Sequence, residues 1–241
     1  MKNGNLCKGK LEILCSKIMQ IGEKFAVFSL VFCLFASNMP YGTALEVHAE
    51  GGMLTENVEI DGVVYKEIEP GKMQLVEWKN EIQVNEEIRI PETVTYGGKD
   101  YTVASIGDSV FAYQYLGKVT FPDTIESIGQ EAFRACGTLQ MAELTLPPNL
   151  KEIGNSAFWC SQIKGELEIP DSVSRIGDQA FRETQISSAV ISNPNIAYGS
   201  SVFAYNANLA SIQLPEGMAS LGGGYFLWGC RSLAQIDIPE S

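Results

Sequence analysis

The phrase ASIGDSVF, at residues 104–111, recurs five more times along the chain with small changes. The later copies are ESIGQEAF at 126–133, KEIGNSAF at 151–158, SRIGDQAF at 174–181, IAYGSSVF at 196–203 and ASLGGGYF at 219–226. The glycine after the third residue of each phrase recurs at spacings of 22, 25, 23, 22 and 23 residues. Because the glycine and the final phenylalanine keep one register throughout, the chain is a tandem repeat.

A second pattern lies between the phenylalanine of one copy and the start of the next. In it a leucine is followed by apolar residues three and five positions later, and then by proline, as in Leu116–Pro122, Leu209–Pro215 and Leu233–Pro239. This is the spacing of the strand segment in leucine-rich repeats. Alternate side chains of a strand face opposite ways, so the apolar ones point inward. The inward pairs are Val119/Phe121, Leu144/Leu146, Leu167/Ile169, Ala189/Ile191, Ile212/Leu214 and Ile236/Ile238.

The other repeat positions indicate how each unit turns. Proline after the strand removes a backbone donor and ends the pairing. The glycine suits a turn that requires positive φ. We expect the Ala-Phe or Val-Phe pair to close the convex side on a short helical or 3₁₀ turn. One repeat cannot bury its apolar face alone, so the units are expected to stack into a continuous core.

The combined unit P-x-x-[VIL]-x-x-I-G-x-x-A-F-x-x-C-x-x-L-x-x-[VI]-x-[IL] resembles the BspA-like class of leucine-rich repeats, over about residues 88–241. The resemblance implies a right-handed solenoid with a parallel β-ladder on the concave face and short helical or 3₁₀ turns on the convex face. Such repeats occur in secreted and surface proteins of bacteria and some parasitic protists. Members are commonly linked to adhesion, host-protein binding or envelope association.

The segment before the repeats, residues 50–87, is acidic and lacks the periodic phrase. Its Asp61-Gly62 pair, between β-branched and aromatic residues, predicts a tight hairpin, and Pro70-Gly71 predicts a second turn. We interpret it as a small β-rich cap covering the first open face of the solenoid. Ile88–Pro91 then forms the first repeat strand, and Tyr96–Lys99 inserts a hairpin. The repeats fill residues 88–241, with the last one incomplete.

Residues 1–49 have the pattern of a signal peptide. Five lysines precede a twelve-residue apolar run, Phe25–Ala36, and Val47-His48-Ala49 offers small residues where a signal peptidase cuts. Twelve helical residues span about 18 Å, short of a bilayer core of about 30 Å. We therefore expect cleaved export and a secreted or cell-surface protein without membrane insertion. An uncleaved signal anchor, or a true start codon further along, is the alternative.

Composition excludes several classes of function. The chain has 29 acidic and 17 basic residues, a net charge of −12, which argues against nucleic-acid binding. Its single histidine, His48, lies in the signal segment, so little remains for histidine-dependent catalysis or metal binding. Removing residues 1–49, with five lysines and three glutamates, makes the net charge −14. No phosphate loop, nucleophile elbow or H-E-x-x-H helix occurs, so we expect no enzyme, cofactor or metal site.

Cys136, Cys160 and Cys230 remain after cleavage and follow the repeat phenylalanine by three, two and four residues. C-x₂-C metal spacing is absent. We interpret them as small buried plugs of the core, with a disulfide or a reactive thiol as the alternative.

Outward-facing residues of the strand ladder form the first candidate ligand face. The candidates are Glu143, Glu166, Glu168, Thr145, Gln213 and Asp237. The three glutamates make an acidic patch in the middle of the ladder. Paired carboxylates are compatible with glycosidase chemistry or a Ca²⁺ site, but a merely solvated or ligand-facing surface is favoured over both.

Aromatic and arginine residues one or two positions after the repeat phenylalanine form the second candidate. They are Tyr113, Trp159, Tyr205, Trp228, Arg134 and Arg182, which neighbouring coils would present along one edge. These residue types anchor protein interfaces. The competing interpretation is that they cover the convex core.

Taken together, these patterns favour an exported, non-enzymatic module that binds a protein or glycan. Adhesion or host-protein binding follows from the family resemblance alone. One alternative is an envelope scaffold, and another is the binding part of a larger protein whose catalytic domain is elsewhere. The sequence stops directly after a strand, so we expect either a continuation, a partner, or self-association at that open end.

Overall fold

The computed structural model describes residues 52–84, 86–137, 144–218, 220–234 and 236. All of them belong to one compact unit, residues 49–241. The signal peptide expected at residues 1–49 lies outside the described residues. Within the described part of the chain, no helix has the length and apolar character needed to cross a bilayer.

The first strands form antiparallel hairpins, as the turn residues predicted. They are β1 (Val58–Ile60), β2 (Val63–Glu69), β3 (Lys72–Trp78), β5 (Thr93–Tyr96) and β6 (Lys99–Ile106). Asp61 and Gly62 both have positive φ, 51° and 75°, in the two-residue turn between β1 and β2. Gly97 and Gly98 do the same between β5 and β6. Because β3 pairs in parallel with β6, the β1–β3 hairpins are continuous with the repeats.

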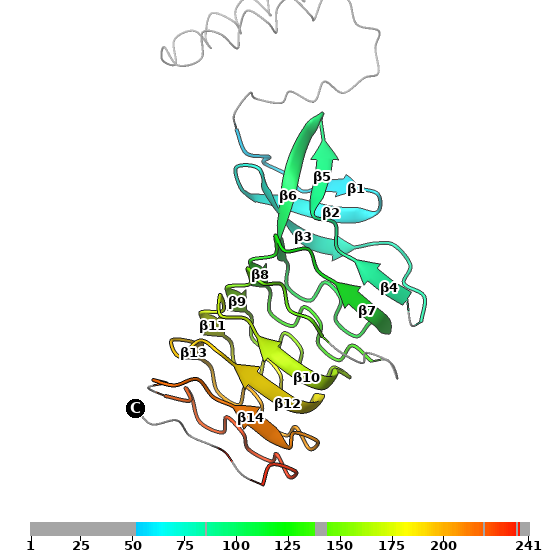
Figure 1. The fold of residues 1–241 in the computed structure, drawn as a ribbon. Helices are drawn as coiled ribbons and strands as arrows, with labels where there is room; N and C mark the ends of the chain where they lie inside the picture. Colours follow the sequence, from blue (N-terminus) through cyan, green and yellow to red (C-terminus); the bar gives the residue numbers. More distant parts are fainter. Residues whose placement is uncertain (1–51, 85, 138–143, 219, 235, 237–241) are drawn as a thin grey trace, which may run out of the picture. The chain divides into compact units, whose positions relative to one another are not determined.

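Most repeats contribute to two parallel ladders, which Figure 1 shows along opposite sides of the stacked coils; residues 144–146, between β7 and β10, are not in a strand. The wide-strand ladder consists of β4 (Glu86–Arg89) paired with β7 (Leu116–Thr120), and of β10 (Lys164–Ile169), β12 (Gln185–Ile191) and β14 (Ser211–Gln213). The short-strand ladder runs from β6 through β8 (Ser127–Ile128), β9 (Glu152–Ile153), β11 (Arg175–Ile176) and β13 (Ala197–Tyr198). The wide-strand ladder was predicted from the sequence, whereas the short-strand ladder was not, because a strand of two residues shows no alternation of apolar and polar side chains.

The core between the ladders contains a column of stacked phenylalanines. The rings of Phe111, Phe133, Phe158, Phe181 and Phe203 follow one another at centroid distances of 5.2, 5.3, 5.2 and 5.5 Å, with interplanar angles of 14° or less. All five are essentially inaccessible to solvent. Phe226 ends the column with an edge contact to Phe203, at 76°. The inward positions predicted from Val119 to Leu214 are likewise buried, except that Phe121 is only half-buried.

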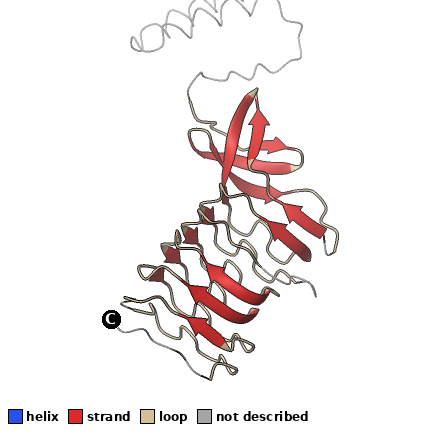
Figure 2. Cartoon of the chain, viewed as in Figure 1, coloured by secondary structure: helices blue, strands red, loops and turns tan. Residues whose placement is uncertain are grey.

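The helical or 3₁₀ turns expected beside the phenylalanines are absent from the described residues; Figure 2 shows loops there. Backbone donors alternate between two kinds of partner. Ser109, Phe111 and Tyr113 donate to carbonyls of the next coil, whereas Ala112 and Gln114 donate three residues back. In the coils of Phe111 to Phe203, the residues two before and two after the phenylalanine have positive φ, as at Ser109 (57°) and Tyr113 (63°). Every second amide is thus used between coils, which rules out a helical bonding pattern.

The repeat glycine is needed for close approach and not, as predicted, for positive φ. Of the six phrase glycines, Gly222 alone has positive φ. A Cβ on Gly154 would lie 2.6 Å from the backbone nitrogen of Gln130, and one on Gly177 would lie 2.6 Å from that of Asn155. Consecutive coils therefore touch backbone to backbone at this position.

We expect Gly154→Ala to destabilise the fold by about 1–3 kcal/mol, because the added methyl forces two coils apart. Urea unfolding followed by circular dichroism measures this change. Gly224→Ala is the matched control, since nothing lies within 4 Å of the added Cβ and the residue is not at positive φ. Equal effects of the two variants would contradict the close-approach explanation.

Phe158→Ala removes the middle ring of the phenylalanine column. We expect a loss of about 3–5 kcal/mol in the free energy of unfolding, from lost burial and the cavity left behind. Val84→Ala, at a side chain 69% exposed, should change it by less than about 0.5 kcal/mol. A small change in the free energy of unfolding for Phe158→Ala would show that the phenylalanine column contributes little to the stability of the core.

Candidate functional site

The turns that flank the phenylalanine column place the predicted aromatic and arginine residues on one edge of the molecule. We call Tyr113, Arg134, Trp159, Arg182 and Tyr205 the planar row; each comes from a successive coil. Neither the hydrophobic core nor the apolar side chains packed against it include the three aromatic members. Their geometry therefore favours a surface row over the alternative of a cover for the core.

Guanidinium groups and rings alternate along the planar row. The Arg134 guanidinium carbon lies 4.2 Å from the centroid of Trp159 and 5.5 Å from that of Tyr113. The Arg182 guanidinium lies 4.7 Å from Tyr205 and 5.7 Å from Trp159. These distances are within the range of cation–π attraction, about 6 Å. The row is thus a continuous stack of five planar groups.

Neighbouring carboxylates hold both arginines and neutralise their charge. Arg134 Nη1 lies 3.1 Å from Glu131, and Arg182 Nε donates to Glu183 over 2.9 Å. The arginine side chains are 27% and 25% exposed, so their stems are held between the rings. The Trp159 Nε1–H is shielded from solvent and has no hydrogen-bond partner among the described residues. An outward-facing row that is neutral and pre-ordered presents ring edges and guanidinium edges to a partner.

A small residue accompanies the large planar one in most coils. Each coil has two residues with positive φ around its phenylalanine, and the second of them and the residue before it form two adjacent slots. These slots hold Ala112/Tyr113, Arg134/Ala135, Trp159/Cys160, Arg182/Glu183, Ala204/Tyr205 and Trp228/Gly229. The planar group takes the second slot at Tyr113 and Tyr205 and the first slot in the other coils, and the small residue leaves room for the neighbouring ring. For example, a Cβ on Gly229 would lie 2.8 Å from the Tyr205 ring. Sequence reasoning found the residues but not this complementarity.

Trp228, also predicted as an anchor, lies at the end of the edge but not in the stack. Its carbonyl accepts from the Tyr205 amide, and its ring meets Tyr225 edge-on at 5.7 Å. Both rings are exposed, Trp228 by 58% and Tyr225 by 68%. Tyr225 was not predicted as a site residue, because it lies before the repeat phenylalanine.

The polar face of the wide-strand ladder is less developed than predicted. Strand register places Glu166, Ser188 and Ser211 in one row, and Glu168, Val190 and Gln213 in the next. Glu166, Glu168 and Gln213 are exposed, and Glu166 accepts a 3.2 Å hydrogen bond from Ser188. Thr145 is exposed but in no strand, and Glu143 and Asp237 lie outside the described residues. An acidic patch therefore consists of two described carboxylates beside small polar groups.

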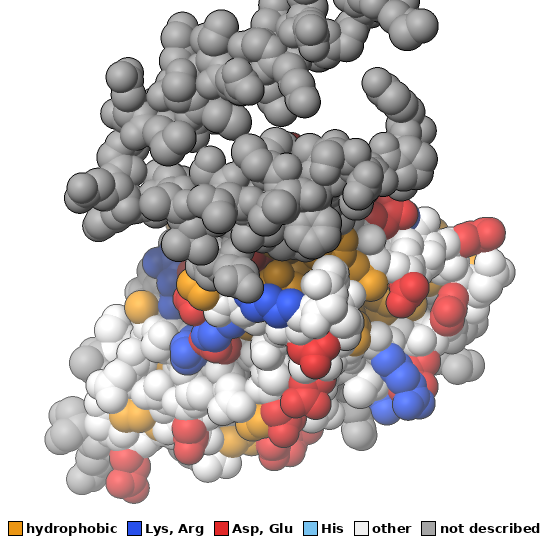
Figure 3. All heavy atoms as spheres, turned by 90° about the horizontal axis from the view of Figure 1, so that it is seen from above, with side chains coloured by type: hydrophobic (Ala, Val, Ile, Leu, Met, Phe, Trp, Pro, Cys, Tyr) orange, Lys and Arg blue, Asp and Glu red, His pale blue; other side chains and the backbone are white. Residues whose placement is uncertain are grey.

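Charged clusters occur elsewhere on the two ladders. Glu126 bridges two lysines: Lys151 and Lys72 donate to its two oxygens, and these hydrogen bonds lower the pKa of its carboxyl group. On β4, the pKa of Glu87 is lowered by Arg89 first and by the Thr120 hydroxyl second. On the face shown in Figure 3, acidic and basic side chains are interspersed and do not form a field of one sign.

The cysteines occupy different environments, which corrects the prediction that all are buried. Cys136 is buried and donates to the Phe111 carbonyl at 2.9 Å, and Cys230 is half-buried and donates to Phe203. Ser161, Thr184 and Asn206 take the equivalent place in other coils. Cys160 precedes this slot by one residue and is exposed beside the planar row. Cys160 follows its repeat phenylalanine by two residues and Cys136 by three, and this difference in spacing could have predicted that Cys160 is exposed.

Metal and catalytic chemistry find little support in the described residues. No group of three or more His, Cys, Asp or Glu side chains is arranged there to hold a metal ion. What the site offers is an ordered surface for binding.

The chain resembles known leucine-rich-repeat proteins. The profile of the BspA type leucine-rich repeat region matches six copies over residues 104–233, more than half of the chain. A leucine-rich repeat protein from Bacteroides ovatus superposes with a TM-score of 0.65 and 27% identity, over 76% of this chain and 47% of that one. The leucine-rich repeat protein of T. pallidum gives 0.62 and 26%, over 77% and 84%. The chain thus spans about half the length of the Bacteroides ovatus protein. No curated protein matches it in sequence.

A double-mutant cycle tests the stacking in the planar row. We expect Arg134→Ala and Trp159→Ala to show a coupling of about 0.5–2 kcal/mol in thermal or urea unfolding, because their groups are 4.2 Å apart. The pair Arg182 and Trp159, at 5.7 Å, should show a weaker coupling. Additive effects in both cycles would mean that the side chains of the planar row do not stabilise one another.

Alkylation at pH 8 should modify Cys160 first. Burial raises the pKa of the Cys136 thiol to about 12, so little thiolate forms there at that pH, and access is also blocked. Burial raises the pKa of Cys230 as well. Among these three cysteines of the described residues, mass spectrometry should find one fast site, which Cys160→Ser abolishes. Rapid labelling of Cys136 in the folded protein would refute the assigned environments.

Proposed function

Because the chain belongs to the BspA-type leucine-rich repeat family, we propose that it is an exported, non-enzymatic binding module that engages a protein or glycan at or outside the cell surface. The observation that carries the proposal is the planar row. It places stacked rings and guanidinium groups on an edge whose aromatic side chains are not part of the hydrophobic core. Tyr113 is 61% exposed and Tyr205 46%. Aromatic and arginine side chains of this kind dominate the energetics of protein interfaces.

Rigidity supports the same role. Each member of the row stands on backbone that is hydrogen-bonded to an adjacent coil. The amides of Tyr113 and Tyr205 donate to the next coil, and the carbonyls of Arg134, Trp159 and Arg182 accept from the previous one. The arginines are held by rings and carboxylates before a partner arrives. A surface ordered in advance loses less side-chain entropy on binding. The row therefore favours recognition over a purely structural role for this edge.

Export is supported by the N-terminal pattern of residues 1–49 and by the family resemblance. Adhesion or host-protein binding is the role that the resemblance implies, and the ligand is then a matrix protein, a glycan or cell-wall material. The described carboxylates of the wide-strand ladder that were candidates for catalysis, Glu166 and Glu168, are exposed to solvent, which supports a non-enzymatic role. If catalysis accompanies binding, it belongs to another part of a longer protein.

A pull-down with the exported protein tests the proposal against extracellular-matrix proteins, glycans and cell-wall material. We expect Tyr113→Ala and Tyr205→Ala to weaken capture at least tenfold, with melting temperatures close to that of the parent protein. Tyr115→Ala is the matched control, because Tyr115 is 62% exposed but outside the planar row.

Three outcomes discriminate the alternatives. Binding that is lost only with the row variants supports recognition through the row. Enrichment with wall material alone, unaffected by the row variants, indicates a scaffold. Failure to capture any of these materials overturns the proposed binding function.

A further inference from the structure

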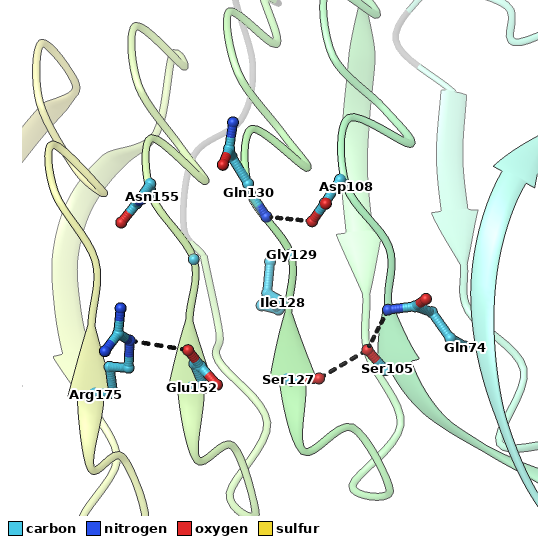
Figure 4. A pocket seen from close by; sticks show the side chains of 11 residues that line it. Gln74, Ser105, Asp108, Ser127, Ile128, Gly129, Gln130, Glu152, Asn155 and Arg175 are labelled. Carbon is cyan, nitrogen blue, oxygen red and sulfur yellow. Dashed lines mark hydrogen bonds and ion pairs between the residues drawn. The ribbon is translucent and has the colours of Figure 1, made fainter. Parts of the chain in front are cut away.

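A groove of about 330 Å³ lies on the short-strand ladder, where β6, β8, β9 and β11 follow one another. Figure 4 shows that two rows of polar side chains border it. One row stands on the strands and contains Ser105, Ser127, Glu152 and Arg175; the other follows the repeat glycine and contains Asp108, Gln130 and Asn155. Both rows run across the strands, along the direction in which the coils stack.

Glycines form the floor of the groove. Gly129 and Gly154 line it between the two rows of polar side chains. The same residues are required for coil contact, as shown above. The groove is therefore a direct consequence of the repeat and spans several coils.

The rows carry hydrogen-bonding groups that the described residues leave unused. Asn155 accepts the Asp178 amide through Oδ1, at 2.9 Å, so its Nδ2 is free to donate. The side-chain amide of Gln130, which is exposed, has no partner among the described residues. Gln74 donates to Ser105 at 3.2 Å and keeps Oε1 as an acceptor. The groove thus mixes donors and acceptors, the combination that hydroxyl groups satisfy.

The same groups disfavour other ligand classes. An apolar ligand finds only Ile128 among the apolar side chains of the lining, and that residue is 1% exposed. An anion meets the Asp108 carboxylate, while Arg175 is already paired with Glu152 at 2.9 Å. A peptide added as a further strand needs a sheet edge, whereas β8, β9 and β11 each have neighbours on both sides.

We propose that this groove binds a linear, uncharged oligosaccharide that lies along the stacking direction, with its hydroxyl groups on Gln130 and Asn155. Consecutive strands are about 4.8 Å apart, and a β-linked hexose unit advances by a similar length. One sugar can therefore meet one coil. The inference rests on the proposed binding function and names a ligand class for a surface separate from the planar row.

Isothermal titration of the exported full chain with cellohexaose, mannohexaose and xylohexaose tests the proposal. At least one should bind, and Gln130→Ala should weaken that binding at least about fivefold through lost hydrogen bonds. Asn155→Asp is the sharper variant. It keeps the acceptor for the Asp178 amide, as Asp108 does for Gln130, and removes the donor. We expect a similar loss with unchanged melting.

Two controls locate the site. Val84→Ala and Tyr115→Ala, at exposed side chains outside the groove and the planar row, should leave oligosaccharide binding unchanged. The proposal is overturned if no neutral hexasaccharide binds, if the groove variants bind as well as the parent, or if an oligogalacturonate of equal length binds more tightly. The pull-down through the planar row can succeed in each of these cases, so the two failures are distinguishable.

Discussion

Consecutive coils meet backbone to backbone at the repeat glycine, and the rest of the structure depends on that contact. The space there is too small for a Cβ: one on Gly199 would lie 2.4 Å from the Asp178 nitrogen. The contact sets the separation at which strand residues pair, at which alternate turn amides reach the next coil, and at which phenylalanine rings stack 5.2–5.5 Å apart. A larger separation would weaken all three kinds of interaction together.

Stacking at a fixed separation turns every repeat position into a row of side chains. Where a row is uniform, as in the phenylalanine column, it contributes to the core. Where residues vary from coil to coil, the row acquires chemical character. The planar row arises because Tyr, Arg, Trp, Arg and Tyr succeed one another in adjacent coils. The groove arises because polar residues flank the glycines in the first coils of the array. Both surfaces are properties of the array and not of any single repeat.

Prediction from sequence succeeded where one residue type recurs and failed where backbone geometry decides. Regular spacing predicted the repeat and the inward pairs, and the Asp61-Gly62 dipeptide predicted its hairpin. The convex turns are not the short helical or 3₁₀ turns that we expected at the Ala-Phe or Val-Phe pair. Positive φ at Ser109 and Tyr113, which neither residue type indicates, instead directs alternate amides to the neighbouring coil. Two-residue strands such as β8 are too short for a period to be seen.

The sequence by itself determined the repeat length, the stacked architecture and the identity of the residues on the exposed edge, because periodic positions must coincide when equal units stack. Only the tertiary structure decided which of these residues touch. Arg134 lies between Tyr113 and Trp159 because each coil places one planar side chain at this edge, beside a small residue such as Ala112 or Ala135. Likewise, Cys136 is buried and Cys160 exposed because a shift of one residue in the turn moves the side chain from the core to the surface.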